Sequence, residues 1–217
     1  FYIANILETE QPSGFLLENV KNLISHDSGR TFRTIQSILS DLGYCVKYSI
    51  LNTMEYGNVP QNRERIYIVG FKDFTQCMRF SFPDAIPLTT KVTDLLEPTV
   101  DKKYYYNGKP LYDHIVNDVT EEGKVYQWRR QYVRENKKNV CPTLTANMGT
   151  GGHNVPIIKD AHGIRKLTPL ECIRFQGFPN SYSLPDNVSD GALYKQAGNS
   201  VSVPVIQRIA ENIRSTF

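Results

Sequence analysis

Residues 61–70 read QNRERIYIVG, a polar and charged stretch followed directly by an apolar one. Its apolar half, residues 66–70, predicts a buried strand because β-branched and aromatic side chains fill most of it. Residues 44–50 alternate in character and predict a second strand. Before them, residues 31–42 place apolar side chains at helical spacing, and Gly43 suits the end of that helix. This order of elements indicates an α/β sheet covered by helices.

The N-terminal residues extend the same pattern. Residues 15–17, FLL, form a short apolar run that predicts a strand buried on both faces, as in a parallel sheet, and ending at Glu18. Residues 1–10 predict the end of an amphipathic helix, which residues 11–14, QPSG, interrupt. We therefore expect this end of the chain to join the same sheet.

The character of the sequence changes in its middle third. Several prolines interrupt the pattern, and residues 84–165 show only short β-like runs, which predicts a smaller, irregular, β-rich domain. Helical signals then return, with Thr168 as N-cap, Pro169 in the first turn and Glu171 three residues after the cap. A last helix with one apolar face is predicted after Ser202.

The composition is that of a globular protein with little net charge. Hydrophobic residues make up 40% of the 217 positions and the formal net charge is +3, so a core can form, and charge alone decides nothing about a nucleic-acid partner. The four cysteines are widely spaced without a CxxC pair, which predicts reduced thiols, no metal site and no disulfide. His114 and His162 are expected at the surface. No apolar run approaches the ~20 residues of a membrane span, and no signal peptide is visible.

Three charged residues are candidates for chemistry. Glu18 follows a predicted strand, where open α/β sheets bind ligands, although a carboxylate there can also cap a turn. Arg63 and Arg65 are two residues apart before another strand, so both side chains are expected on one face, where they can clamp a phosphate or a carboxylate. A solvated charged loop explains the arginines equally well.

Residues 124–138 concentrate positive charge, with six lysines and arginines against one acidic residue. Interleaved aromatic residues favour DNA contact over a solvated charged face. In residues 141–154, small residues let the backbone approach bases closely and polar side chains can read base edges, although a glycine-rich hairpin without a ligand has the same composition. The expected DNA-contacting residues are Arg129, Arg130, Arg134, Lys137, Thr143, Asn147, Thr150 and His153.

Four ordered blocks together resemble those of the DNA cytosine-5 methyltransferase family. They are Glu18-Asn19-Val20, the Gln-x-Arg-x-Arg pattern of residues 61–65, residues 165–179 (RKLTPLECIRFQGFP), and Gly198-Asn199-Ser200-Val201. Order and spacing agree with the family from about residue 14 to the end. The least similar part is residues 84–140, the region that selects the target sequence in this family.

The resemblance implies a fold and an organisation. The fold would be the C-terminal part of a Rossmann-like, S-adenosylmethionine-dependent methyltransferase sheet, joined to a small, irregular, β-rich target-recognition domain. Residues 1–83 would belong to the large catalytic domain and residues 84–165 to the recognition domain. Residues 166–197 would form a hinge, and residues 198–217 a helix that returns to the large domain.

The resemblance also assigns roles. Glu18 would share a proton with N3 of the target cytosine, Arg65 would offset charge near O2, and Arg63 would support Glu18 or a phosphate. The partner would be double-stranded DNA with the target base flipped out, in a bacterial cytoplasm without membrane attachment. The residues bordering S-adenosylmethionine would be Asn199, Ser200 and Val201.

The blocks that open the family are not found in these 217 residues. They are a glycine-rich cofactor loop and a Pro-Cys-Gln block with the nucleophile, and Cys141 precedes a proline instead of following one. We therefore expect an enzyme fragment that is inactive alone, whose remainder was removed or is a complementary N-terminal polypeptide. The alternatives are a non-catalytic, sequence-specific DNA-binding module and, since one branch of the family acts on tRNA, an RNA methyltransferase. A companion polypeptide with a Pro-Cys-Gln block would separate the first two readings.

Overall fold

The computed structural model describes residues 2–150 and 154–217. The chain forms two compact units, each assembled from separate stretches of sequence. Unit 1 consists of Phe1–Asn52, Glu64–Ala85 and Val205–Phe217, and unit 2 of Thr53–Arg63 and Ile86–Pro204. The division of function expected at residues 83, 165 and 197 stays a prediction, because the two units describe packing and not activity.

Unit 1 is built on a three-stranded sheet in the order β1–β4–β2. The strands are β1 (Gly14–Val20), β2 (Cys45–Asn52) and β4 (Glu64–Phe71). The strands predicted at residues 44–50 and 66–70 are confirmed. The parallel pairing predicted for residues 15–17 is wrong, because β4 lies between β1 and β2 and pairs antiparallel with both. β1 also continues to Val20, so Glu18 lies within the strand instead of after it.

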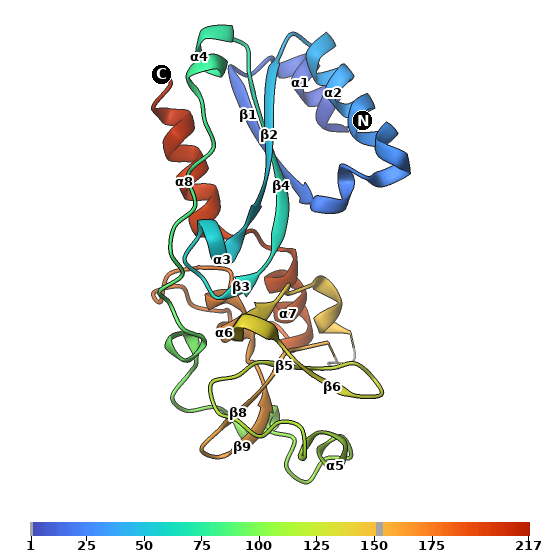
Figure 1. Ribbon diagram of the computed structural model, residues 1–217, viewed down its shortest axis with the longest axis vertical. Helices are drawn as coiled ribbons and strands as arrows, with labels where there is room; N and C mark the ends of the chain where they lie inside the picture. The colour runs from blue at the N-terminus through green and yellow to red at the C-terminus, as the bar shows by residue number, and fades with distance from the viewer. Residues whose placement is uncertain (1, 151–153) are drawn as a thin grey trace. The chain divides into compact units, whose positions relative to one another are not determined.

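Helices cover both faces of this sheet. Phe32 and Leu39 pack in one core cluster with Ile66 and Ile68 of β4, while Tyr67, which points to the opposite face, is only 1% exposed. This two-sided burial explains the apolar runs without any parallel pairing. Figure 1 shows α1 (Tyr2–Glu10) and α2 (Arg30–Asp41) on one side of the sheet and α8 (Val203–Arg214) on the other.

The predicted helices of unit 1 are confirmed. Residues 31–42 form α2, and residues 1–10 correspond to α1. Gly43 ends α2 with a φ of +80°, and its N–H donates to the carbonyl of Ser40 at 2.8 Å. Glycine adopts this left-handed conformation without strain. The other helical elements of this unit are η1 (Lys21–Leu23), η2 (His26–Gly29) and α4 (Phe74–Arg79).

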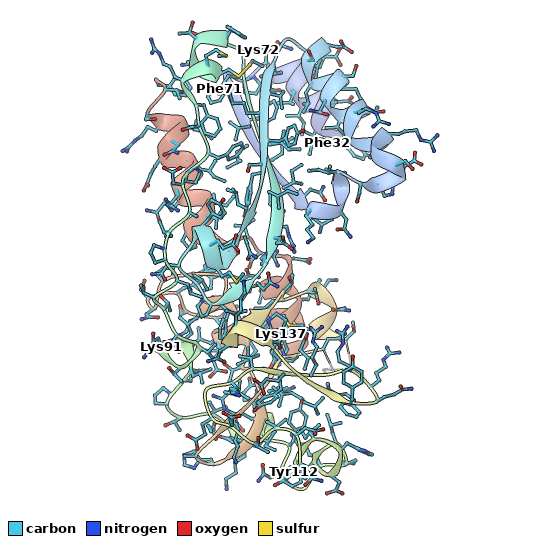
Figure 2. All side chains as sticks on the ribbon, in the orientation of Figure 1. Phe32, Phe71, Lys72, Lys91, Tyr112 and Lys137 are labelled. Atoms are coloured by element: carbon cyan, nitrogen blue, oxygen red, sulfur yellow. A yellow bond between two sulfur atoms is a disulfide. The ribbon has the colours of Figure 1, made fainter. Side chains whose placement is uncertain are left out.

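A disulfide joins Cys45 of β2 to Cys77 of α4. In Figure 2 it is the yellow bond beside Phe71 and Lys72. The prediction of reduced thiols is therefore wrong for this pair, whereas Cys141 and Cys172 are free. The two cysteines meet because α4 follows β4 and packs back against β2, a contact that the spacing of the cysteines does not reveal.

Unit 2 is an irregular unit with short strands, as the sequence predicts. Its four-stranded antiparallel sheet has the order β6–β5–β8–β9, and a short parallel pair joins β3 to β7. Its strands are β3 (Gln61–Asn62), β5 (Tyr126–Trp128), β6 (Val133–Glu135), β7 (Cys141–Pro142), β8 (Ile157–Asp160) and β9 (Gly163–Lys166). Its short helices are α3 (Thr53–Tyr56), η3 (Val92–Leu95), η4 (Lys102–Tyr104), α5 (Tyr112–Ile115), η5 (Lys137–Asn139) and η6 (Ala146–Gly149).

Two longer helical elements complete unit 2. α6 (Pro169–Arg174) begins as predicted, because the Glu171 N–H donates to the Thr168 hydroxyl and the Thr168 N–H donates to the Glu171 carboxylate. α7 (Asp190–Asn199) lies mostly within the segment expected to act as a hinge, a role that stays a prediction. Asn199 is the last residue of α7 and Ser200 its C-cap, so the helix expected over residues 198–217 begins only at Val203.

Within residues 2–150 and 154–217, no helix has both the length and the apolar character needed to cross a membrane. The same residues contain no group of three or more histidine, cysteine, aspartate or glutamate side chains placed to hold a metal ion.

Thiol titration of the denatured protein tests the disulfide. Because Cys45 and Cys77 are bonded, two cysteines should react without reductant and all four after reduction. Reduction should also lower the free energy of unfolding by about 2–4 kcal/mol, measured in urea. The Cys45→Ser variant should show no such dependence on reductant. Four reactive thiols in the unreduced protein would contradict the pairing.

Candidate active site and nucleic-acid interface

Glu18 and Arg65 form an ion pair within unit 1. Arg65 Nε lies 3.0 Å from Glu18 Oε1, and the side chains are 13% (Arg65) and 23% (Glu18) exposed. Antiparallel pairing of β1 with β4 sets Val20 opposite Arg65 and Glu18 opposite Tyr67, which brings the two charged side chains together. Glu18 Oε1 is buried and faces Arg65, and it makes no other polar contact within the described residues. Oε2 is therefore the carboxylate oxygen that is left for a further partner.

A hollow of about 650 Å³ opens beside Glu18. Its walls come from α1, β1, α2 and β4, and include Leu17, Ile38 and Ile68 together with polar Asn19 and Thr31. The register places the Glu18 side chain with Arg65 and Tyr67 on the opposite face of the sheet from Leu17 and Ile68, so the carboxylate does not face this hollow.

Arg63 has different surroundings from Arg65. It is 3% exposed, and its guanidinium donates to the carbonyls of Leu144 (2.9 Å) and Ser200 (2.7 Å), with that of Gly198 at 3.5 Å. The prediction that both arginines share one face is wrong, because β3 ends at Asn62 and β4 begins at Glu64, so strand alternation breaks at Arg63. A side chain this inaccessible does not clamp a phosphate.

Gln61 is a site residue that the sequence does not single out. It is fully buried, donates to the Phe175 carbonyl (2.5 Å) and the Gln176 side chain (3.2 Å), and accepts from the Leu144 N–H (3.2 Å). Gln176 in turn donates to the carbonyl of Ala197 at 2.7 Å. The available signal was its place in the Gln-x-Arg-x-Arg pattern, but the partners lie far away in the sequence.

The glycine-rich segment presents polar side chains at the surface of unit 2. Asn147 and Thr150 are exposed, and Thr143 is half-buried. The Thr145 hydroxyl donates to the Asn147 side chain, and the Thr150 hydroxyl to the Asn147 carbonyl at 2.8 Å. The Thr143 hydroxyl donates a hydrogen bond to the carbonyl of Asn62 at 2.7 Å. The predicted residue His153 lies outside the described residues.

The basic segment keeps most, but not all, of its positive charge available. Arg129, Arg130 and Lys137 are exposed, and Figure 2 labels Lys137. Lys124 is neutralised by Glu121 (2.7 Å) and Glu135 (2.9 Å), whose hydrogen bonds raise its pKa. The net charge presented to a ligand is therefore smaller than residues 124–138 indicate by themselves.

The two predicted DNA-contacting segments meet at one hollow of about 500 Å³ in unit 2. Arg129, Arg134 and Lys137 line it from the basic segment, and Thr143 from the glycine-rich one. The exposed Arg134 also donates to the Gln127 side chain. Three cations around a concave surface fit a polyanion.

The predicted cofactor segment ends α7. Asn199 is exposed and Val201 half-buried, whereas the Ser200 hydroxyl donates to the Ala197 carbonyl at 2.8 Å. Ser202, which the sequence does not single out as a ligand, has its hydroxyl buried without a hydrogen-bond partner among the described residues. An orphaned hydroxyl and an exposed amide fit one edge of a site for a polar ligand.

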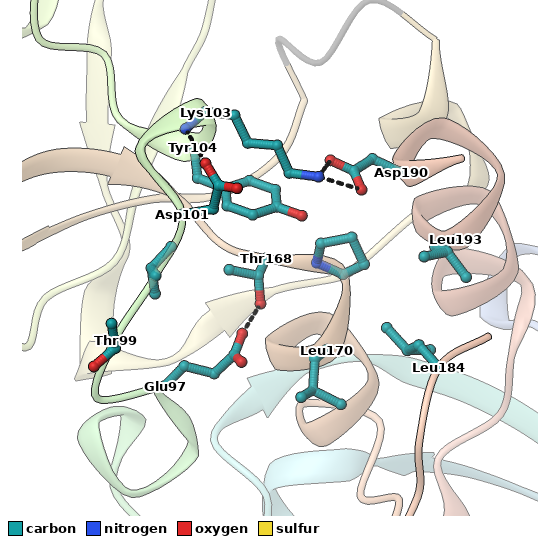
Figure 3. Close-up of a pocket in the computed structure, with 12 residues that line it drawn as sticks. Glu97, Thr99, Asp101, Lys103, Tyr104, Thr168, Leu170, Leu184, Asp190 and Leu193 are labelled. Carbon is teal, nitrogen blue, oxygen red and sulfur yellow. Dashed lines mark hydrogen bonds and ion pairs between the residues drawn. The ribbon is translucent and has the colours of Figure 1, made fainter. Parts of the chain in front are cut away.

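A smaller cavity of about 280 Å³ lies elsewhere in unit 2 (Figure 3). Lys103 pairs with Asp190 at 2.9 Å across it, and the Thr168 hydroxyl donates to Glu97. None of the predicted site residues lines it. Nearby, Arg165 and Glu171 form a buried bidentate pair, both bonds measuring 2.8 Å, which ties β9 to the start of α6.

Neither free cysteine is placed for nucleophilic attack. Cys141 and Cys172 are both fully buried in the core of unit 2. Burial raises the pKa of each thiol well above its usual range. Since the thiolate is the reactive form, both cysteines are inert packing residues.

Comparison with known proteins assigns the chain to a family. The family described as C-5 cytosine-specific DNA methylase matches residues 1–215. The chain belongs to this family. It is 52% identical to the type II methyltransferase M.Bsp6I of Bacillus sp. (strain RFL6), over 98% of this chain and 69% of that protein. It is 43% identical to the type II methyltransferase M.SsoII of Shigella sonnei, over all of this chain and 57% of that protein. The resemblance seen in the sequence blocks is thus confirmed at the level of the family.

Solved structures share the fold at low identity. The S. pombe Dnmt2 methyltransferase superposes with a TM-score of 0.71 at 18% identity, covering 98% of this chain and 70% of that one. A putative DNA modification methyltransferase from an E. coli prophage gives 0.68 at 17% identity, covering 99% and 72%. The predicted fold class is confirmed, and the chain spans between about half and three quarters of the proteins that it matches.

Proposed function

We propose that this chain supplies target recognition and part of the active site for methyl transfer from S-adenosylmethionine to C5 of a cytosine flipped out of double-stranded DNA. The observation that carries the proposal is the partly buried Glu18–Arg65 ion pair. Both residues stand in blocks that resemble those of the C-5 cytosine-specific DNA methylase family, to which the chain belongs. This membership favours an enzyme over a non-catalytic binding module.

The pair suits the charge that develops on the base. Attack of a nucleophile at C6 of cytosine moves negative charge onto N3 and O2. Glu18 can share a proton at N3 through Oε2, because Arg65 Nε already holds Oε1. Arg65 holds Glu18 through Nε and the Glu64 carbonyl through Nη1. That leaves Nη2, which has no hydrogen bond within the described part of the chain, to donate at O2.

The nucleophile is not among these residues. Cys45 and Cys77 are bonded to each other, and Cys141 and Cys172 are buried with raised pKa values. We infer that the thiolate that attacks C6 comes from residues outside these 217, in the same polypeptide or in a complementary one.

The cofactor would lie against the end of α7. Asn199 and the orphaned Ser202 hydroxyl are the polar groups of this chain that would hold it, with Ser200 and Val201 between them. S-adenosylmethionine, when bound, supplies a methyl group on a sulfonium centre. Only one edge of the site is formed by this segment, so the 217 residues alone should bind the cofactor weakly.

DNA would be held by unit 2. Phosphate contacts anchor a duplex without selecting its sequence, while contacts to base edges select it. Arg129, Arg130, Arg134 and Lys137 fit the first task, because they are long, cationic and exposed. Asn147 and Thr150 fit the second, because their short polar side chains stand on a glycine-rich turn.

We expect the polypeptide of these 217 residues to transfer no methyl group, because all four cysteines are unsuitable as nucleophiles. The measurement is incorporation of label from S-adenosylmethionine into duplex DNA. Adding a polypeptide that carries a Pro-Cys-Gln block should restore incorporation, whereas the same polypeptide with serine for that cysteine should not. Methylation by the 217 residues alone would disprove the inference about the nucleophile.

In the complete enzyme, Glu18→Gln should slow turnover by about 10²–10⁴-fold and change DNA affinity little. The carboxyl acts on charge that is largest in the transition state, so its loss appears in kcat. Glu64→Gln is the matched control, since Glu64 is a neighbouring carboxylate paired with Lys21 instead. Parallel losses of affinity and turnover in Glu18→Gln would assign Glu18 a structural role.

Lys137→Ala and Asn147→Ala should distinguish phosphate contacts, which anchor the duplex, from base-edge contacts, which select its sequence. The lysine variant should weaken binding to cognate and scrambled duplexes alike and reduce the salt slope by about 1. The asparagine variant should lose about 1–3 kcal/mol on the cognate duplex only. The cognate site is first obtained by bisulfite sequencing of DNA from a host that expresses the enzyme.

Exposed Lys102 and Asn117 provide matched alanine controls. Equal losses of Asn147→Ala on cognate and scrambled DNA would show that this segment does not read bases.

A further inference from the structure

We infer that Gln61 and Arg63 are positioning residues that tie the recognition segment (residues 143–150) to the end of α7, so that DNA and cofactor binding are coupled within unit 2. The inference rests on the proposed function, since it assigns the recognition segment to DNA and the end of α7 to the cofactor. It separates the roles of two arginines that stand two positions apart in one motif.

Arg63 bridges the two segments directly. One nitrogen of its guanidinium donates to Leu144, at the start of the recognition segment, and the other to Ser200, at the C-cap of α7. The planar fork of arginine can serve two carbonyls at once, which the single ammonium of lysine does with much poorer geometry. Because the side chain is 3% exposed, water cannot easily replace either bond.

Gln61 makes the same connection by a second route. Its side chain accepts from the Leu144 N–H and donates to the Gln176 side chain, which donates to Ala197 near the end of α7. The backbone of β3 also pairs with β7, immediately before the recognition segment. Both routes therefore start at residues 141–144 and finish at residues 197–200.

Glycines allow the recognition segment and α7 to pack backbone against backbone. A Cβ on Gly198 would lie 2.1 Å from the carbonyl carbon of Thr145, and a Cβ on Gly149 would lie 2.2 Å from the carbonyl oxygen of Gly191. The backbone of α7 therefore rests directly on the recognition segment at both ends of η6. A packed contact of this kind deforms little, so a shift of residues 143–150 must move α7 or break the contact.

The consequence is reciprocal coupling. If binding of DNA orders the recognition segment, it also orders the end of α7 for the cofactor, and the cofactor favours cognate DNA by the same factor. We expect cognate duplex to tighten binding of S-adenosylhomocysteine to the complete enzyme by about 5–150-fold. Scrambled duplex, which makes only phosphate contacts, should tighten it far less.

Arg63→Lys tests the bridge while keeping its charge and most of its length. It should lower the coupling factor several-fold, since only the Gln61 route remains, and the factor is measured as the ratio of S-adenosylhomocysteine dissociation constants without and with cognate duplex. Gly198→Ala should have the same effect by a different route, since it separates α7 from Thr145. Arg79→Met is the control, because Arg79 is an exposed arginine of unit 1 and should leave the factor unchanged.

A merely structural role gives a different result. It would weaken each ligand separately or lower the melting temperature, but the ratio would keep its wild-type value. Unchanged coupling in both Arg63→Lys and Gly198→Ala would overturn the inference. If wild-type enzyme neither methylates DNA nor binds S-adenosylhomocysteine, the proposed function fails instead, which is a distinguishable outcome.

Hydrogen exchange of the wild-type enzyme gives a test without substitutions, should the variants not fold. S-adenosylhomocysteine alone should slow exchange of amides in the recognition segment, and cognate duplex alone should slow exchange at residues 197–203. Protection of only the directly contacted segment by each ligand would overturn the coupling.

Discussion

Burial of β4 on both faces is the constraint on which unit 1 depends. Its residues 66–69 are at most 3% exposed, so the strand is stable only with a neighbour on each edge and a helical layer on each face. β1 and β2 supply the edges, and α1, α2 and α8 supply the layers. The same strand begins with charged residues, and Arg65 meets this condition by pairing with Glu18. The Glu18–Arg65 pair is thus a consequence of where the core strand must start.

Unit 2 depends on buried polar groups more than on regular secondary structure. Its strands are short, and its inaccessible residues include Gln61, Arg63, Arg165, Glu171 and Gln176. Buried polar networks contribute little net stability compared with apolar packing, but they are satisfied in only one arrangement. This specificity suits a unit that must hold irregular segments in one place.

The residues of the Gln-x-Arg-x-Arg motif make contacts in two different units. In the Gln-x-Arg-x-Arg pattern, Arg65 faces Glu18 in unit 1, while Gln61 and Arg63 hold main-chain groups in unit 2. The chain passes from one unit to the other between Arg63 and Glu64. Neighbouring residues of one motif therefore have different partners, a side-chain carboxylate for Arg65 and main-chain groups for Gln61 and Arg63, so equivalent substitutions of the two arginines would remove different contacts.

The sequence by itself determined the local elements and the family. Helical spacing and Gly43 predict α2, the pair Thr168 and Glu171 predicts the start of α6, and the order of four blocks indicates the methyltransferase family, because each signal acts over a few residues. Only the tertiary structure decided which groups meet: the Cys45–Cys77 bond, the neutralisation of Lys124 and the partners of Arg63. The physical reason is that burial and ion pairing depend on distant segments whose approach is set by packing, and residue type and spacing do not specify that approach.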